Sequence, residues 1–218
     1  MAKKFCLRSC CKSAFATIPL FTFFILFNTN LLAANMSNNS SANNSSTSKS
    51  GNTHYQKAIL AGGCFWGVQE LFRKQDGIIK TKVGYAGDNI VNPTYELVST
   101  GLTKYAESIE ITFDPAKISY EKILKFFFTI HNPTTIDRQE NDVGKQYRSE
   151  IFYLNDEQKK IAQSVIIQAN NSGVFKKPVV TKISQAGEFS EAEEHHQNYL
   201  QKNPYGYTCH HVRNEWKF

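Results

Sequence analysis

The sequence predicts an α+β fold arranged in two layers, and three observations lead to this prediction. Segments with the period-two alternation of strands and segments with helical periodicity intermix along the chain. They do so without the strict strand–helix–strand rhythm of a parallel sheet. The 218 residues are 41% hydrophobic and 13% aromatic, which is enough apolar material for a buried core.

The first predicted elements follow one another closely. Residues 57–61 are apolar and followed by two glycines, so we expect a strand there. Residues 65–73 place their large apolar side chains on one helical face, and Asp76-Gly77 ends this helix. Residues 78–85 and 107–113 alternate between polar and apolar side chains, as half-buried strands do.

The later elements surround a long polar segment. A helix is predicted over 120–130, with Ser119 as its N-cap. Residues 131–147 lack periodicity, and a loop of this length in a compact domain is usually functional or disordered. Strands are further predicted over 148–154 and 179–184, helices over 156–170 and 190–201, and an irregular tail over 202–218.

The first 34 residues have the composition of a secretory signal peptide. A basic stretch precedes an apolar run over 14–27, and Ala33 and Ala34 provide small residues for cleavage. The run is short for a transmembrane helix, so an uncleaved anchor is the alternative and the only predicted membrane contact. This signal predicts export to the periplasm or cell envelope. Residues 35–53 are almost all Asn, Ser and Thr, which predicts a disordered linker before a single domain over 54–218.

Charge and cysteine content narrow the function classes. The net charge is +6, but residues 1–34 carry four basic residues and no acid, leaving 21 basic against 19 acidic residues, or +2. Without a dense basic stripe, we expect no nucleic-acid binding. Only Cys64 and Cys209 follow the leader, so the body is not a disulfide-rich scaffold.

The segment Gly62-Gly63-Cys64-Phe65-Trp66-Gly67 carries the clearest chemical pattern. A thiol at the start of a helix lies near unpaired backbone N–H groups and the positive end of the helix dipole, which favours the nucleophilic thiolate. The two rings after Cys64 indicate an apolar pocket for a small group. The alternative is a buried, inert cysteine.

Three polar segments supply partners for Cys64. Tyr95 follows Asn-Pro-Thr in a loop, Glu107 opens an apolar strand, and Asp142 and Tyr147 lie in the long polar segment. A phenol donates well to an oxygen atom, and a buried carboxylic acid stays protonated and can act as an acid. Each of these residues also has an ordinary structural role as its alternative.

The histidines leave other chemistries open. A zinc site needs three or four convergent ligands, and neither His195-His196 nor Cys209-His210-His211 has a known ligand spacing, so we predict no metal site. A peroxidase, a hydrolase with Cys64 activated by His131 or His196, and a non-catalytic module with a Cys64–Cys209 bridge remain alternatives.

From about Ala58 to Tyr207, the chain resembles the A-type peptide methionine sulfoxide reductases. The similarity rests on several motifs in the same order rather than on one. They are Gly62–Gly67, Gly84-Tyr85-Ala86-Gly87, Asn92-Pro93-Thr94-Tyr95, Ala106-Glu107, residues 141–149 (NDVGKQYRS), His196-Gln197-Asn198-Tyr199-Leu200 and Lys202-Asn203-Pro204.

The resemblance implies a two-layer sandwich with a ferredoxin-like core and a mixed sheet. It also implies thiol-dependent reduction of methionine-(S)-sulfoxide, in oxidised proteins and as the free amino acid, for protein repair. The implied roles are Cys64 as nucleophile, Phe65 and Trp66 as the methyl pocket, Glu107 as acid, Tyr95 and Tyr147 as hydrogen-bond donors, and Asp142 as a substrate-orienting group.

The resemblance further implies how the enzyme is recycled. Cys64 is left as a sulfenic acid, which condenses with the resolving Cys209 to a disulfide. A thioredoxin-like dithiol then reduces this disulfide, and no cofactor is bound. We expect the protein to act as a monomer.

Overall fold

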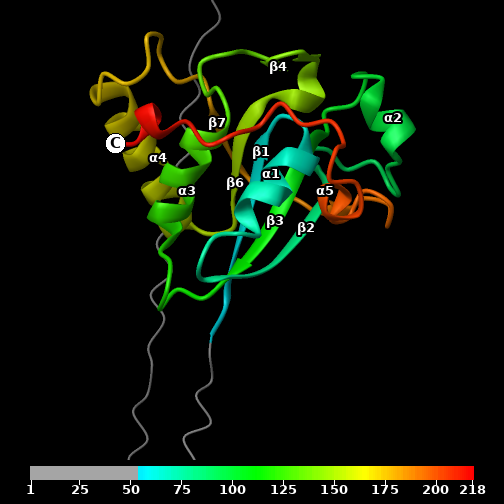
Figure 1. Ribbon diagram of the computed structural model, residues 1–218, viewed down its shortest axis with the longest axis horizontal. Coiled ribbons are helices and arrows are strands. Elements are labelled where there is room, and N and C mark those ends of the chain that lie inside the picture. The colour runs from blue at the N-terminus through cyan, green and yellow to red at the C-terminus, as the bar shows by residue number, and fades with distance from the viewer. Residues whose placement is uncertain (1–53) are drawn as a thin grey trace, which may run out of the picture. The chain divides into compact units, whose positions relative to one another are not determined.

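The computed structural model describes residues 54–218; the predicted signal peptide and linker lie outside them. A six-stranded sheet with the order β7-β6-β1-β3-β2-β8 forms its centre (Figure 1). The pair β6–β7 is parallel and the other pairs are antiparallel, so the predicted α+β class and mixed sheet are confirmed. The strands are β1 (Gln56–Gly62), β2 (Ile78–Ala86), β3 (Ala106–Phe113), β6 (Ser149–Tyr153), β7 (Lys182–Gln185) and β8 (Ser190–Glu191).

Three helices cover one face of this sheet and form the main core. They are α1 (Phe65–Phe72), α3 (Tyr120–Ile130) and α4 (Asp156–Asn171). Alternate side chains of the central strands, including Leu60 and Ile109, pack against their apolar faces. On the other face, a smaller cluster around Ile59, Ala106 and Phe152 is covered by Ala186 and Phe189.

The strand register brings the predicted site residues to one end of the sheet. Gly62, the last residue of β1, pairs with Ser149 at the start of β6. Because β3 runs antiparallel to β1, its first residues lie at the same end, where Tyr85 pairs with Glu107. Cys64 therefore leaves the sheet beside the start of β3 and the segment that enters β6.

The predicted N-cap of α3 and the long polar loop are each held by hydrogen bonds of their own side chains. The Ser119 side chain accepts a hydrogen bond from the Lys122 N–H at 3.2 Å, which confirms the predicted N-cap of α3. The loop 131–147 contains the short strands β4 (Arg138–Gln139) and β5 (Asp142–Val143) and the 3₁₀ helix η1 (Lys145–Tyr147). The Gln139 amide bonds both the N–H and the C=O of Asn132, which holds this polar loop in place.

The predicted helix over 190–201 is wrong. Only α5 (Tyr199–Lys202) is helical, after the left-handed Asn198 (φ 53°). The Gln197 side chain bonds both the N–H and the C=O of Val83, so this segment completes the edge of β2 instead of forming a helix. The strand predicted over 179–184 begins later, at Lys182, because Val180 N–H bonds the Pro133 carbonyl outside the sheet.

Two further helices are short. They are α2 (Tyr95–Ser99), capped by the Thr94 side chain, and the 3₁₀ helix η2 (Asn214–Trp216) in the otherwise irregular tail. No helix between residues 54 and 218 is both long and apolar enough to cross a bilayer.

Candidate active site

Cys64 occupies the N-cap of α1, after a turn that glycine makes possible. Gly63 has φ +100°, a conformation that residues with a Cβ rarely adopt. A Cβ added to Gly67 would lie 2.5 Å from Thr208 Oγ1 and 2.8 Å from His210 Nδ1. The C-terminal tail therefore lies directly against the first turn of α1, beside Cys64.

The predicted thiolate state of Cys64 is wrong for the free protein. The residue is only 6% exposed, and burial raises its pKa well above the ordinary value. A negative charge on Glu107 would raise this pKa further, whereas the hydrogen bond from the Trp66 N–H opposes the shift. One backbone N–H of a short helix does not offset desolvation, so Cys64 rests as a neutral thiol.

Glu107 is held as a neutral acid next to the cysteine turn. Its Oε2 accepts a hydrogen bond from the Phe65 N–H at 3.0 Å, and the residue is 2% exposed. Burial, assisted by the charge of Asp142, raises the pKa of Glu107 to about 8, against the opposing effect of the Phe65 N–H. At neutral pH this carboxyl group therefore carries a proton that it can donate.

Two phenols and a carboxylate complete the polar side of the site. Tyr95 begins α2, Tyr147 ends η1, and Asp142 lies in β5. Burial raises the pKa of Tyr95 to about 12, and the charges of Glu107, Cys64 and Asp142 contribute. The same three groups raise the pKa of Tyr147, after burial. The structure thus brings the five predicted polar residues together, with both phenols protonated and able to donate.

The predicted aromatic pair forms the apolar side of the site. Phe65 is 1% exposed and packs against Tyr85, with 6.0 Å between ring centroids. Trp66 stacks on Tyr199 with 3.9 Å between centroids, and its indole N–H donates to His196 Nδ1 at 3.1 Å. The tryptophan ring is therefore fixed on two sides, as the wall of a small pocket requires.

Sequence reasoning missed a carboxylate that supports this wall. Glu193 accepts a hydrogen bond from the Tyr85 hydroxyl at one oxygen and from the Tyr95 N–H at the other, each at 2.8 Å. It thereby joins β2 to the start of α2. The predicted helix over 190–201 concealed this role, since a helix would have placed Glu193 among solvated charges.

Cys209 is a free thiol close to the site. Its Sγ donates to Asp142 Oδ2 and also contacts His210 Nδ1, both at 3.3 Å. Asp142 also accepts a hydrogen bond from the Tyr207 hydroxyl at 3.1 Å. Since Cys64 is also a free thiol, this fold forms without a bridge between the two cysteines.

Neither histidine proposed for a hydrolase hydrogen-bonds to Cys64 in this arrangement. His131 is buried, with Nδ1 bonded to the Phe127 carbonyl and Nε2 to Ser149 Oγ, each at 2.7 Å. Nδ1 of His196 is taken by the Trp66 indole N–H. Within residues 54–218, no group of three His, Cys, Asp or Glu side chains could hold a metal ion.

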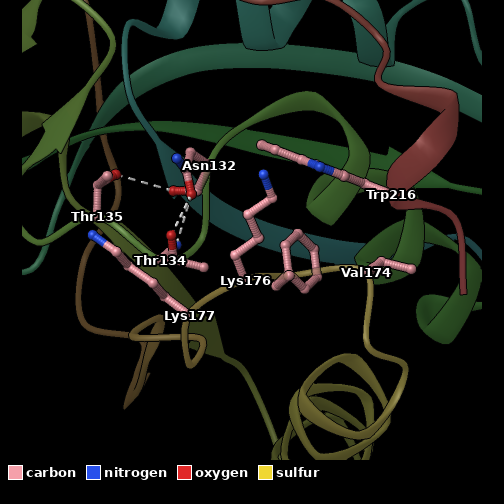
Figure 2. A pocket seen from close by; sticks show the side chains of 8 residues that line it. Asn132, Thr134, Thr135, Val174, Lys176, Lys177 and Trp216 are labelled. Atoms are coloured by element: carbon pink, nitrogen blue, oxygen red, sulfur yellow. Dashed lines mark hydrogen bonds between the residues drawn. The ribbon is translucent and has the colours of Figure 1, made fainter.

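A separate cavity of about 410 Å³ lies away from these residues. Figure 2 shows its lining, which includes Asn132, Thr134, Lys176 and Trp216. None of the predicted site residues lines this cavity. The hydroxyl group of Thr134, which does line it, already donates a hydrogen bond to Asn132 Oδ1. The cavity is therefore not the candidate active site.

Comparison with known proteins identifies the family. The family model for peptide methionine sulfoxide reductase matches residues 56–217. The peptide methionine sulfoxide reductase MsrA of Mycolicibacterium paratuberculosis is 56% identical over 165 residues, covering 76% of this chain and 94% of that protein.

Solved structures agree with the sequence match. Mxr1 from Saccharomyces cerevisiae in reduced form has a TM-score of 0.69 and 35% identity, covering 73% of this chain and 93% of that one. The same Mxr1 in complex with Trx2 has a TM-score of 0.51 and 25% identity, covering 73% and 91%. With a family match over most of its length and a fold shared with Mxr1, this chain belongs to the peptide methionine sulfoxide reductase family.

Proposed function

We propose that this enzyme reduces methionine-(S)-sulfoxide, in oxidised proteins and as free methionine sulfoxide, and that Cys64 is the nucleophile. The observation that carries the proposal is the convergence of a thiol, a protonated carboxyl group and two phenols beside an aromatic wall. A sulfoxide has a polar S=O group and a small methyl group. This arrangement offers donors to the first and an apolar surface to the second.

The chemistry follows from the resting protonation states. Glu107 donates its proton to the sulfoxide oxygen, with Tyr95 and Tyr147 donating hydrogen bonds to the same atom. The Cys64 sulfur attacks the sulfoxide sulfur, while the methyl group rests against Phe65 and Trp66. The oxygen, now protonated, passes from the methionine sulfur to the Cys64 sulfur: the methionine S–O bond and the transient S–S bond break, and the Cys64 S–O bond forms. Methionine leaves reduced by two electrons, and Cys64, oxidised by two electrons, is left as a sulfenic acid. The proton of the Cys64 thiol passes to the Glu107 carboxylate and replaces the proton that Glu107 donated to the sulfoxide oxygen.

Cys209 then resolves the sulfenic acid in this proposal. Its thiol lies on the tail segment that packs against α1, and its charge is near enough to affect the pKa of Cys64. Condensation releases water and leaves a Cys64–Cys209 disulfide. A thioredoxin-like dithiol reduces it, and the complex of Mxr1 with Trx2 supports this choice of reductant.

We expect the Cys209→Ser variant to complete a single turnover. It forms one methionine per protein and then stops, because the Cys64 sulfenic acid has no resolving thiol. Mass spectrometry after dimedone treatment checks this, since dimedone traps sulfenic acids. Normal cycling of the variant with a thioredoxin would contradict the resolving role.

We expect Tyr95→Phe and Tyr147→Phe each to lower kcat/KM by about 10-fold, and the double variant by about 100-fold. Each loses one hydrogen bond to the sulfoxide oxygen, worth about 1.4 kcal/mol in the transition state. Steady-state kinetics with a sulfoxide peptide measure the effect. Tyr205→Phe is the matched control because Tyr205 is fully exposed, and an equal loss in this variant would refute the assignment.

We further propose that the enzyme works as a monomer in the periplasm or cell envelope. The basic and apolar composition of residues 1–34 supports export. Mass spectrometry of the mature N-terminus tests the export signal. We expect a start at Ala34 or Asn35, and an intact Met1 in the envelope fraction would indicate an anchor.

The direct test of the substrate uses both epimers of a methionine sulfoxide peptide and of the free amino acid, with a thioredoxin system as reductant. We expect oxygen loss from the S epimer in both forms and none from the R epimer. A protein that reduced neither epimer, or both equally, would contradict the proposed function.

A further inference from the structure

The imidazole of His210 is locked in one tautomer by the backbone that carries Cys64. Its Nε2 lies 2.8 Å from the Gly62 carbonyl oxygen, and the residue is 7% exposed. A carbonyl oxygen only accepts hydrogen bonds, so Nε2 must carry the proton. In the neutral ring, Nδ1 then holds a free lone pair.

That lone pair faces the Cys209 thiol. The Nδ1 atom lies 3.3 Å from Cys209 Sγ, within reach of its proton. The same thiol also lies 3.3 Å from Asp142 Oδ2. Asp142 in addition accepts the Tyr207 hydroxyl proton in a hydrogen bond. Nδ1 therefore offers the Cys209 proton a lone pair that no other hydrogen bond occupies.

The resolving step needs such an acceptor. Thiol–disulfide chemistry proceeds through the thiolate, and burial, followed by the hydrogen bond to Asp142, raises the pKa of Cys209 to about 12. Very little thiolate exists at neutral pH without help. A base that removes the proton during attack overcomes this limit.

We propose that His210 is the general base of the resolving step, an inference that rests on the proposed role of Cys209. Nδ1 takes the Cys209 S–H proton as that sulfur attacks Cys64 Sγ. The S–O bond of the sulfenic acid breaks, and the departing hydroxide takes a proton from solvent and leaves as water. The two sulfurs share the new bond, Cys209 is oxidised, and the imidazolium returns its proton to solvent.

The surroundings of His210 keep this base available. The ring contacts Cys209 on one side, and the charged or titratable groups of Asp142, Arg213, His211 and His131 also act on it. Burial is the main cause that lowers the pKa of His210, with Arg213 adding to the shift and Asp142 opposing it. The ring is therefore neutral, with Nδ1 unprotonated, at neutral pH.

The test is His210→Gln, whose amide can still donate to the Gly62 carbonyl but offers no base. After one turnover of a methionine-(S)-sulfoxide peptide without reductant, quenched samples are assayed for methionine, dimedone-reactive Cys64 and disulfide. We expect methionine formation at the wild-type rate and disulfide formation about 100-fold slower at pH 7.5. His211→Gln, at the exposed neighbouring histidine, is the control and should match wild type.

The pH profile separates a base from a structural support. In wild type, we expect the rate of disulfide formation to be level between pH 7 and 9. In His210→Gln, it should rise about tenfold per pH unit, because hydroxide must ionise Cys209 directly. In His210→Asn the rate of disulfide formation should rise with pH in the same way. This variant replaces His210→Gln in the test if the glutamine variant does not fold.

Two outcomes would overturn the proposal in different ways. If Cys209→Ser accumulates the sulfenic acid but the His210 variants form disulfide at the wild-type rate or with the wild-type pH profile, His210 is not the base. If Cys209→Ser does not accumulate the sulfenic acid, Cys209 is not the resolving residue, and the proposed role of His210 as its general base is also wrong.

Discussion

Replacing Cys64 with serine is expected to abolish sulfoxide reduction, with a loss of at least about 1,000-fold. A serine hydroxyl is a far weaker nucleophile than a thiol, and it cannot form the sulfenic acid on which the cycle depends. The measurement is methionine release from a sulfoxide peptide under single-turnover conditions, so that the supply of reductant does not affect the result.

The melting temperature of Cys64→Ser distinguishes a catalytic from a structural cysteine. Because Cys64 and Cys209 are free thiols in the folded protein, the substitution breaks no bridge and should shift the melting temperature little. Cys209→Ser is the matched control, since it removes the other thiol but keeps one turnover. If Cys64→Ser still released methionine, another group would have to be the nucleophile.

Glu107→Gln is expected to lower single-turnover reduction by about 100- to 10,000-fold. The glutamine side chain keeps the size of the acid and can still accept the Phe65 N–H, but it has no proton to give to the sulfoxide oxygen. Glu110→Gln is the matched control on the same strand, because Glu110 pairs with Lys57 at the surface. Equal losses in the two variants would show that Glu107 is not a specific acid.

The same substitution should stabilise the protein at alkaline pH. Glu107 has a pKa of about 8 when folded, above its ordinary value of 4.5, so the folded state binds this proton more tightly. Its contribution is present below pH 4.5 and is lost as the pH rises toward 8. At pH 8 we expect Glu107→Gln to melt several degrees above wild type, with little difference at pH 4. A wild-type protein that melts higher at both pH values would contradict the raised pKa.

The elements that the sequence predicted well are those with strong local patterns. The apolar strand before Gly62, the helix after Cys64 and the capped helix after Ser119 all follow from periodicity and glycine or serine at the ends. Segment 190–201 failed because its conformation is set by a distant strand. The Gln197 side-chain amide bonds the backbone N–H and C=O of Val83, which is 114 residues away in the sequence. A local sequence pattern cannot predict such a distant contact.

The candidate site divides in the same way. Cys64 and its rings stand out locally, but Glu107, Tyr95, Asp142 and Tyr147 could be assigned only through the resemblance, since single polar residues have many ordinary roles. The helix end alone predicts a thiolate at Cys64. Burial, which cannot be read locally from the sequence, raises the pKa of Cys64 and keeps the resting thiol protonated. Glu193 and His210 act through long-range contacts, and only the fold reveals these.

The most direct test of the account follows both sulfur atoms during one turnover. Reduced enzyme is mixed with the S or R epimer of a methionine sulfoxide peptide without reductant, and methionine and the state of each cysteine are measured together. We expect one methionine per protein from the S epimer, with equal loss of the Cys64 and Cys209 thiols into one disulfide. Methionine formed while Cys64 remains a thiol would contradict the account.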